Sequence, residues 1–143
     1  MKLKIGSVII VAVVLFIILG AAYLITRPRA TPPDTAIHYH PQIHISLCGK
    51  SMDLPKNTGT AALHTHEDIP VLHLEGAKAQ LGDYFKIILV TFNDTCFGTY
   101  CNGNICPSSG EAGTLAVYVN GTETSLGRNY ALRDGDDVLI EFK

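Results

Sequence analysis

The sequence lacks the cysteine and nucleophile patterns that mark several enzyme classes. Its four cysteines form no C-x-x-C pair, which a thioredoxin-like redox site requires, and no two close pairs of the zinc-knuckle kind. No serine or cysteine nucleophile pattern, internal repeat or coiled-coil pattern occurs. These absences argue against an enzyme. They leave open a metal-dependent hydrolase with Glu67 or Glu75 as general base beside a histidine-bound zinc ion.

Basic residues are scarce in the C-terminal part of the chain. From Ile37 to Lys143 there are seven Lys and Arg residues against twelve Asp and Glu, a net charge of −5 with neutral histidines. Proteins that bind nucleic acids neutralise phosphate charge with Lys and Arg. We therefore expect no nucleic-acid partner. About 107 residues can bury one modest core, which predicts a single domain.

A long uncharged run is present near the N-terminus. The 21 residues from Ile5 to Ile25 are enough, at about 1.5 Å per residue, to cross a hydrocarbon core about 30 Å thick. The run is longer than the apolar region of a cleavable signal peptide. We predict an uncleaved membrane anchor over residues 1–26, a proline-rich linker over 27–36 and a folded domain over 37–143.

Two sequence features place the folded domain outside the cytoplasm. Lys2 and Lys4 precede the apolar run and Arg27 and Arg29 follow it, so the basic residues only weakly favour a cytoplasmic N-terminus. The triplets that begin at Asn93 and Asn120 fit the glycosylation pattern, although Asn-Gly is also a hairpin turn. We predict a single-pass protein of the cell membrane with an extracytoplasmic C-terminal domain.

The cysteines predict disulfides in such a compartment. Cys96, Cys101 and Cys106 are spaced C-x4-C-x4-C, and Cys48 lies far away in the sequence. Four cysteines allow three pairings, and we expect one bridge within the 96–106 loop and one from that loop to Cys48, an arrangement that leaves all three pairings open. The alternative is that one thiol pair stays reducible, as a redox-sensitive lid or a sulfur-bearing metal site.

Polar and apolar residues alternate from His38 to Leu47, which predicts a strand with His38, His40, Gln42 and His44 on one face and apolar residues on the other. The next segment, "CGKSMDLP", predicts a turn at Gly49-Lys50 and a short returning strand. The segments "ALHTH" and "VLHLE", joined by "EDIP", could form a second hairpin.

The second half predicts one helix and further strands. Apolar residues at helical spacing predict an amphipathic helix of about three turns. Its stripe is Leu81, Tyr84, Phe85, Ile88, Leu89 and Phe92. The β-branched run "KIILVTF" leaves a strand as the alternative. Asn120-Gly121 predicts a hairpin between "TLAVYV" and "TETSL", after a loop from Asn93 to Gly113. The last strand would point Val138, Ile140 and Phe142 inward.

The order of hairpin, helix and hairpin is that of an α+β, β-grasp-like (ubiquitin-like) domain. The ending "LRDGDDVLIEF" resembles the close of ubiquitin-like sulfur-carrier proteins, in which an Asp-Gly-Asp turn precedes the final strand. Those carriers end in a free Gly-Gly tail, whereas this chain ends in Glu141-Phe142-Lys143. The resemblance therefore implies the fold and not the carrier function.

All six histidines lie within 36 residues, and their spacing decides which of them can share a metal ion. Residues i and i+2 of a strand lie about 6.6 Å apart on one face, so His38 with His40, and His64 with His66, can each bind one ion. His40 and His44 would lie about 13 Å apart. These two histidines are therefore too far apart to bind the same ion unless the strand bends.

The second hairpin adds a third histidine if its register is right. A four-residue loop would pair His64 with His73 on one face, with His66 beside them and Glu67 and Asp68 at the rim. A slip of one residue would move His73 to the other face. Imidazole nitrogens suit copper(II) or zinc, and the only methionine of the domain, Met52, argues against a copper(I) site.

The segment "LHTHED…VLHLE" also resembles small, largely uncharacterised membrane-anchored proteins of archaea and bacteria. Their pattern is a His-Thr-His-Asp stretch followed by a hydrophobic-His-hydrophobic-Glu stretch, matched here by residues 63–68 and 72–75. "YHPQIHI" and "LGDYF" match more loosely. Pro70 stands where that pattern has a glycine, and the group has no established activity.

The sequence thus favours a membrane-tethered, extracytoplasmic module that binds copper or zinc in order to deliver, buffer or sense it. We expect His64, His66 and His73 as ligands, with His38 or His40 as a fourth. The alternative is a non-catalytic accessory subunit that docks a membrane-protein partner through the edge of its sheet. In that case the histidines would form a pH-dependent surface.

Overall fold

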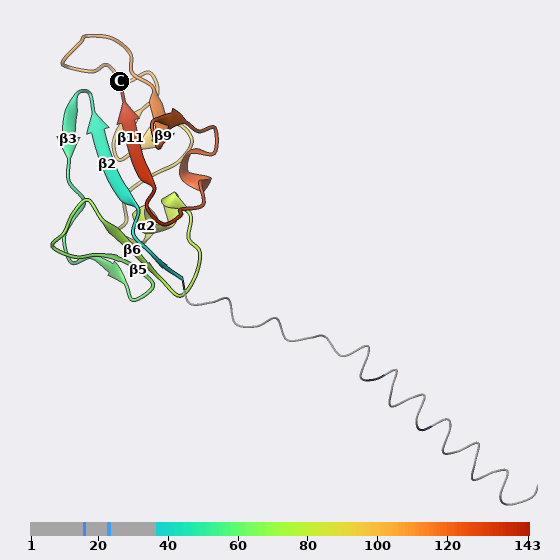
Figure 1. The fold of residues 1–143 in the computed structure, drawn as a ribbon. Helices are drawn as coiled ribbons and strands as arrows, with labels where there is room; N and C mark the ends of the chain where they lie inside the picture. Colours follow the sequence, from blue (N-terminus) through green and yellow to red (C-terminus); the bar gives the residue numbers. More distant parts are fainter. Residues whose placement is uncertain (1–15, 17–22, 24–36) are drawn as a thin grey trace, which may run out of the picture. The chain divides into compact units, whose positions relative to one another are not determined.

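The computed structural model describes Phe16, Tyr23 and residues 37–143 (Figure 1). The predicted linker, and the predicted anchor apart from Phe16 and Tyr23, lie outside the described residues. Phe16 and Tyr23 are helical and exposed. None of the helices in the described part is long and apolar enough to span a bilayer. The chain divides into two units, residues 1–32 and residues 33–143.

The described domain is mostly β-structure with one short helix. Its larger sheet has five strands in the order β10-β9-β11-β2-β3. These strands are β2 (Gln42–Leu47), β3 (Lys50–Met52), β9 (Leu115–Val119), β10 (Thr122–Glu123) and β11 (Asp137–Phe142). The central pair, β2 and β11, is parallel, and the other pairs are antiparallel. Figure 1 shows β2 and β11, which are the first and last of these strands along the chain, side by side.

A second, antiparallel sheet carries three of the six histidines, His38, His64 and His73, and His40 and His66 directly follow two of its strands. Its strands have the order β1-β6-β5-β4. They are β1 (His38–Tyr39), β4 (Gly59–Thr60), β5 (Leu63–Thr65) and β6 (Leu72–Glu75). The hairpin of β5 and β6 was predicted from "ALHTH" and "VLHLE", and the structure confirms it.

The strand predicted from His38 to Leu47 is divided between the two sheets. β1 pairs with β6, and β2 pairs with β11 and β3. Pro41, between them, has no N–H to donate to a ladder, and its carbonyl accepts from the N–H of Leu72. The predicted alternation survives the break. Pro41 and the apolar residues of β2 are buried, whereas His38 and His44 are exposed.

Helix α2 (Leu81–Ile87) is shorter than the predicted three turns. Its buried face includes Leu81, Tyr84 and Phe85, as predicted. Leu89 breaks the expected stripe, since it adopts a φ of 60° and is 92% exposed. The β-branched residues that begin at Ile87 disfavour helix because their χ1 freedom is restricted. They do not form the alternative strand either.

The core lies between α2 and the two sheets. Val138, Ile140 and Phe142 of β11 are fully buried, which confirms the predicted inward face. Phe92 follows the helix in irregular chain and contacts Phe85 edge to face, with ring centroids 5.4 Å apart. It reaches the core without belonging to the helix.

Two turns need residues with positive φ. The Asn120-Gly121 hairpin forms as predicted, with φ values of 50° and 79°. The first hairpin turns at Cys48-Gly49 rather than at Gly49-Lys50, with φ values of 53° and 79°. Lys50 is the first residue of β3. Glycine accepts positive φ without steric cost, so it fixes the position of both turns.

Both asparagines of the glycosylation-type triplets are engaged in turns. Asn120 Oδ1 accepts the N–H of Asp137, and its Nδ2 donates to Asp136 Oδ1. Asn93 Oδ1 accepts the N–H groups of Thr95 and Cys96. The hydrogen bonds of these turns therefore explain the presence of both asparagines without glycosylation.

Two disulfides form, one within the 96–106 loop and one from that loop to Cys48, as expected; the pairs are Cys48 with Cys106 and Cys96 with Cys101. The second joins β7 (Cys96–Phe97) and β8 (Tyr100–Cys101). The segment predicted as a loop from Asn93 to Gly113 therefore contains a small hairpin.

Candidate metal centre

The register of β5 and β6 is the predicted one. His64 lies opposite His73, flanked by the pairs Leu63 with Leu74 and Thr65 with Leu72. Side chains alternate between the faces of a strand. The flanking residues are buried, so His64 and His73 share the outer face.

Strand β1 brings the second group of histidines to the same face. His38 lies opposite Glu75, two residues beyond His73 on β6. The ring centroids of His38 and His40 are 4.5 Å apart, and those of His40 and His73 are 4.9 Å apart. Two histidine groups that are separate in the sequence are therefore adjacent in the fold.

The five histidines His38, His40, His64, His66 and His73 form what we call the histidine cluster. Its closest contact joins His64 Nε2 and His66 Nε2, which are 3.2 Å apart. The ring centroid of His73 lies 5.5 Å from that of His64 and 4.7 Å from that of His66. At these distances every ring of the cluster contacts another.

The sixth histidine, His44, lies apart from the cluster. It belongs to β2 of the larger sheet, and its Nε2 lies 3.4 Å from Asp137 Oδ1. No ring of another described histidine contacts it. The structure thus brings together five of the six histidines that the sequence marks as candidate ligands.

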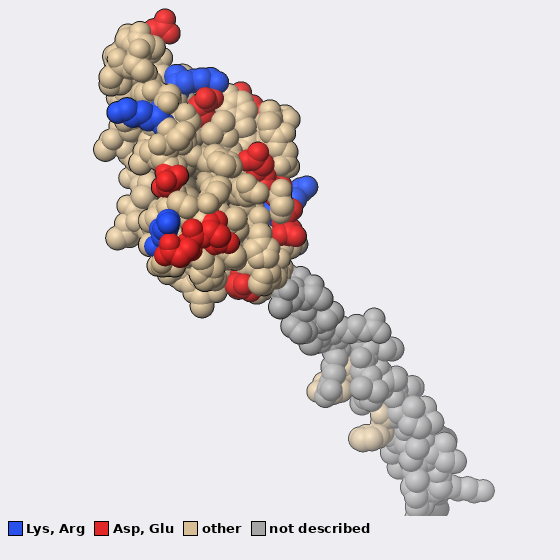
Figure 2. Space-filling view, turned by 60° about the vertical axis from the view of Figure 1, so that its left-hand side comes forward, with Lys and Arg blue, Asp and Glu red and all other residues tan. Residues whose placement is uncertain are grey.

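Carboxylates surround the histidine cluster. Glu75 Oε2 lies 3.0 Å from His38 Nδ1. Asp134 Oδ1 accepts the backbone N–H of His40 at 2.9 Å and lies 3.6 Å from its Nδ1. Sequence reasoning missed Asp134, although it belongs to the Asp-Gly-Asp turn before the last strand. On the face shown in Figure 2, acidic side chains lie at several places on the lower half of the domain.

The two predicted rim residues differ in their contacts. Asp68 Oδ2 lies 3.4 Å from His73 Nε2. Glu67 instead accepts from Lys56 Nζ and Asn57 Nδ2, at 3.1 and 2.6 Å. Hydrogen bonds from Asn57 and then Lys56 lower the pKa of Glu67. Of the two carboxylates, Asp68 is therefore the one at the cluster.

His73 is the most enclosed of the paired histidines, with a side chain 14% exposed. Its Nε2 is buried and has no well-aligned hydrogen bond, although Asp68 Oδ2 lies 3.4 Å away. Burial lowers the pKa of His73, against the opposite effect of Asp68, and His66 and His40 lower it further. His64 Nδ1 is likewise buried without a partner. Neutral imidazole with a free lone pair is the form that binds metal.

The core side of β5 holds the cluster in place. Thr65 is 1% exposed, and its hydroxyl donates to the carbonyl of Pro55 at 2.6 Å. Thr58 Oγ1 lies 2.9 Å from the Tyr84 hydroxyl, which connects this segment to α2. Gly59 of β4 lies opposite His64 with a φ of 118°. A Cβ atom there would overlap the Leu63 carbonyl oxygen, so only glycine fits beside His64.

Within residues 37–143 no three His, Cys, Asp or Glu side chains already surround a common point as metal ligands do. One pair comes close to that geometry. Two nitrogens bound to a tetrahedral ion at about 2.0–2.1 Å lie about 3.3 Å apart. The 3.2 Å between His64 Nε2 and His66 Nε2 is near this value. A third nitrogen would have to come from a neighbouring ring by side-chain rotation.

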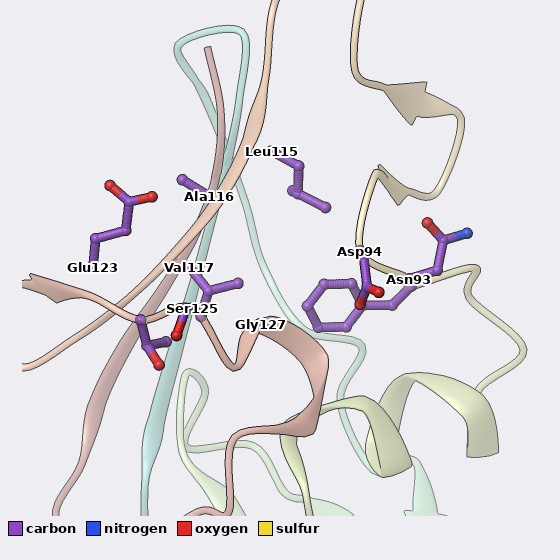
Figure 3. A pocket seen from close by; sticks show the side chains of 10 residues that line it. Asn93, Asp94, Leu115, Ala116, Val117, Glu123, Ser125 and Gly127 are labelled. Atoms are coloured by element: carbon purple, nitrogen blue, oxygen red, sulfur yellow. The ribbon is translucent and has the colours of Figure 1, made fainter.

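Two hollows of the described domain lie away from the histidine cluster. One of about 210 Å³ is lined by residues around β9 and β10 (Figure 3). Asp94 and Glu123 stand on its opposite sides. An apolar groove of about 390 Å³ lies between β2, β3, α2 and the β7–β8 hairpin. Neither is lined by a histidine of the cluster.

Comparisons with protein-family models, with curated proteins and with solved structures find no match to this chain. The resemblance of "LHTHED…VLHLE" to membrane-anchored proteins of archaea and bacteria therefore stays a prediction.

Proposed function

We propose that this protein is a membrane-tethered, extracytoplasmic metal-binding module that holds copper(II) or zinc through its histidine cluster. Such a module would deliver, buffer or sense the metal near the membrane. The observation that carries the proposal is the convergence of imidazoles from separate strands, centred on the 3.2 Å contact of His64 Nε2 with His66 Nε2.

His73 is the third ligand in this proposal. Its ring lies 4.7 Å from that of His66, and its buried Nε2 lacks a well-aligned partner. A buried polar atom without a hydrogen bond costs free energy, which a metal bond would recover. Asp68, now 3.4 Å from this nitrogen, would move to the second coordination shell.

His40 is the better candidate for a fourth ligand than His38. Its ring contacts His73, and Asp134 fixes its backbone. His38 is one ring further away, with its Nδ1 3.0 Å from Glu75. Four nitrogens would close a zinc site, whereas three would leave a position open for an exogenous ligand. An open position suits delivery of the metal to a partner.

The fold and location in this proposal follow the sequence. The strand order β10-β9-β11-β2-β3, with parallel β2 and β11 at its centre and one helix between the hairpins, supports a β-grasp domain. β1 and β4–β6 would be an addition to it. Two disulfides support an oxidising, extracytoplasmic compartment. The apolar run from Ile5 to Ile25 would be the anchor.

The test is metal retention by the full chain, purified in detergent and loaded with zinc or copper(II). We expect about one tightly held ion per chain after desalting, and a loss of at least tenfold in affinity for the variant with His64→Ala and His66→Ala. His44→Ala is the matched control, because His44 lies apart from the cluster. Equal retention by the control and the double variant would contradict the proposal.

A second candidate function is supported by the carboxylates. Four histidines, His38, His40, His44 and His73, each lie 3.0–3.6 Å from an Asp or Glu oxygen. Protonation would turn these contacts into ion pairs and make the surface more positive. A non-catalytic accessory subunit could use this change to bind a membrane-protein partner in a pH-dependent manner. Partner capture that varies with pH but not with chelator would support this function over metal binding.

A further inference from the structure

The two disulfides lie in different surroundings. Cys48 and Cys106 connect the β2–β3 turn to a distant loop across 58 residues; Cys48 is half-buried, and Cys106 is only 2% exposed. Cys96 and Cys101 lie directly opposite each other on β7 and β8, and both are half-buried. Exchange of a disulfide requires that a thiolate can reach a sulfur atom. The Cys96–Cys101 pair meets that condition better.

The hairpin that holds Cys96 and Cys101 has its own supports. Asn93 Oδ1 accepts the N–H of Cys96 at 2.8 Å, and Asn104 Oδ1 accepts the N–H of Cys101 at 2.7 Å. Phe97, next to Cys96, is 4% exposed and packs against Phe85 and Phe92 in the core. These contacts do not involve sulfur.

The hairpin of β7 and β8 should therefore keep its structure when the disulfide between Cys96 and Cys101 is reduced. The Cα atoms of Cys96 and Cys101 are 4.0 Å apart, and antiparallel pairing by itself keeps directly opposed Cα atoms within about 4.5–5.5 Å of each other. The two thiols would remain neighbours after reduction. A pair held in this way can be oxidised again without refolding the domain.

One polar group distinguishes the two sulfurs. The Thr95 hydroxyl donates to Asn93 Oδ1 at 3.2 Å, and its oxygen lies 3.7 Å from Cys96 Sγ, so the hydroxyl can turn toward the sulfur. A hydroxyl can donate to a thiolate, and a stabilised thiolate is the better leaving group in exchange. Attack on Cys101 Sγ, with Cys96 leaving, is therefore favoured over attack on Cys96.

We propose that Cys96–Cys101 is a thiol–disulfide exchange site that accepts two electrons from an external dithiol. A thiolate of the dithiol attacks Cys101 Sγ, forming a mixed disulfide and releasing the Cys96 thiolate beside Thr95. The second thiolate of the dithiol then attacks the dithiol's first sulfur atom, which is bonded to Cys101 in the mixed disulfide, and releases the Cys101 thiolate. The dithiol becomes a disulfide, and its two protons end on Cys96 and Cys101. This activity needs no metal and is independent of the histidine cluster.

The test treats the folded full chain with limiting dithiothreitol, blocks free thiols with iodoacetamide and locates them by mass spectrometry. Cys96 and Cys101 should be labelled at least tenfold faster than Cys48 and Cys106. Labelling of all four at one rate, faster labelling of Cys48 and Cys106, or no labelling before denaturation would overturn the proposal.

The direction of attack has its own readout. Glutathione, a monothiol, should leave its adduct on Cys101 rather than on Cys96. Thr95→Val should slow reduction several-fold, whereas Thr95→Ser keeps the hydroxyl and should react like the wild type. Thr99→Val, at the tip of the same hairpin, is the control. An adduct on Cys96, or equal rates for all these variants, would contradict the assigned role of Thr95.

Discussion

His64 on β5 and His73 on β6 lie directly opposite each other, with ring planes 14° apart and ring centroids separated by 5.5 Å. This pair connects the histidines of two sequence segments, because His66 contacts both rings and His40 contacts His73. Directly opposed residues of an antiparallel pair share a face. The register of one short hairpin therefore builds the histidine cluster.

Substitution of Gly59 by alanine should damage both stability and the cluster. The added Cβ would overlap the Leu63 carbonyl oxygen and crowd His64, on backbone with a φ of 118°. Backbone in a sparsely populated region costs about 1–3 kcal/mol for a residue other than glycine, and the overlap adds to it. Urea unfolding should show at least this loss, together with weaker metal binding.

Gly76→Ala is the matched control for that substitution. Gly76 also has a positive φ, of 84°, but a Cβ there meets nothing within 4 Å. It should lose about 1 kcal/mol of stability from backbone strain and keep its metal affinity. Equal effects of the two substitutions on metal affinity would show that the crowding of His64 is irrelevant.

The stability of the metal-free protein should fall on acidification because of His73. Burial lowers the pKa of His73 in the folded state, whereas in the unfolded chain it titrates near about 6.5. Below that value the unfolded state binds the proton first, so stability is lost as the pH falls from about 6.5 through the lowered pKa. Urea unfolding at several pH values should show a smaller decline for His73→Gln. A decline unchanged from the wild type would contradict this assignment.

The two disulfides should differ in their contribution to stability. Chain entropy predicts about 4 kcal/mol for a bridge that closes 58 residues and about 2 kcal/mol for one that closes 5. Paired serine substitutions at Cys48 and Cys106 should therefore lower the free energy of unfolding more than those at Cys96 and Cys101. Thermal and urea unfolding measure the difference, and the reverse order would be incompatible with these structural roles.

Asp134 should support metal binding without touching the metal. It accepts the N–H of His40 and lies beside its ring. Loss of such supporting groups commonly lowers metal affinity about 10- to 100-fold. Asp134→Ala should therefore weaken zinc binding about tenfold in a competition titration, whereas Asp137→Ala, beside the distant His44, should not. Unchanged affinity in Asp134→Ala would remove His40 from the centre.

The sequence predicted the local pairing of the histidines well, because strand alternation and a four-residue connection determine which residues face each other. His64 opposite His73 and the buried face of β11 both follow from such spacing. Spacing did not reveal which loop cysteine bonds to Cys48. The adjacency of His40 and His73 could only be posed as a question. It depends on the chain passing from the sheet of β1 to the sheet of β2 at Pro41. This is a tertiary effect that alternation alone does not reveal.

The errors have physical causes too. Helix α2 stops at Ile87 because Leu89 adopts positive φ and Phe92 reaches the core from irregular chain. Apolar spacing alone could not distinguish this arrangement from a longer helix. Asp134 was missed because it lies 94 residues from His40 in the sequence. Sequence spacing gives no signal over that distance.

The most direct test of the account is X-ray absorption spectroscopy of the zinc-loaded full chain. The proposed metal centre requires a first coordination shell with at least three imidazole nitrogens at about 2.0–2.1 Å, unchanged in His44→Ala and lost in the variant with His64→Ala and His66→Ala. A shell of oxygen ligands with fewer than two imidazoles, or the same spectrum in the double variant, would contradict the histidine cluster as a metal centre.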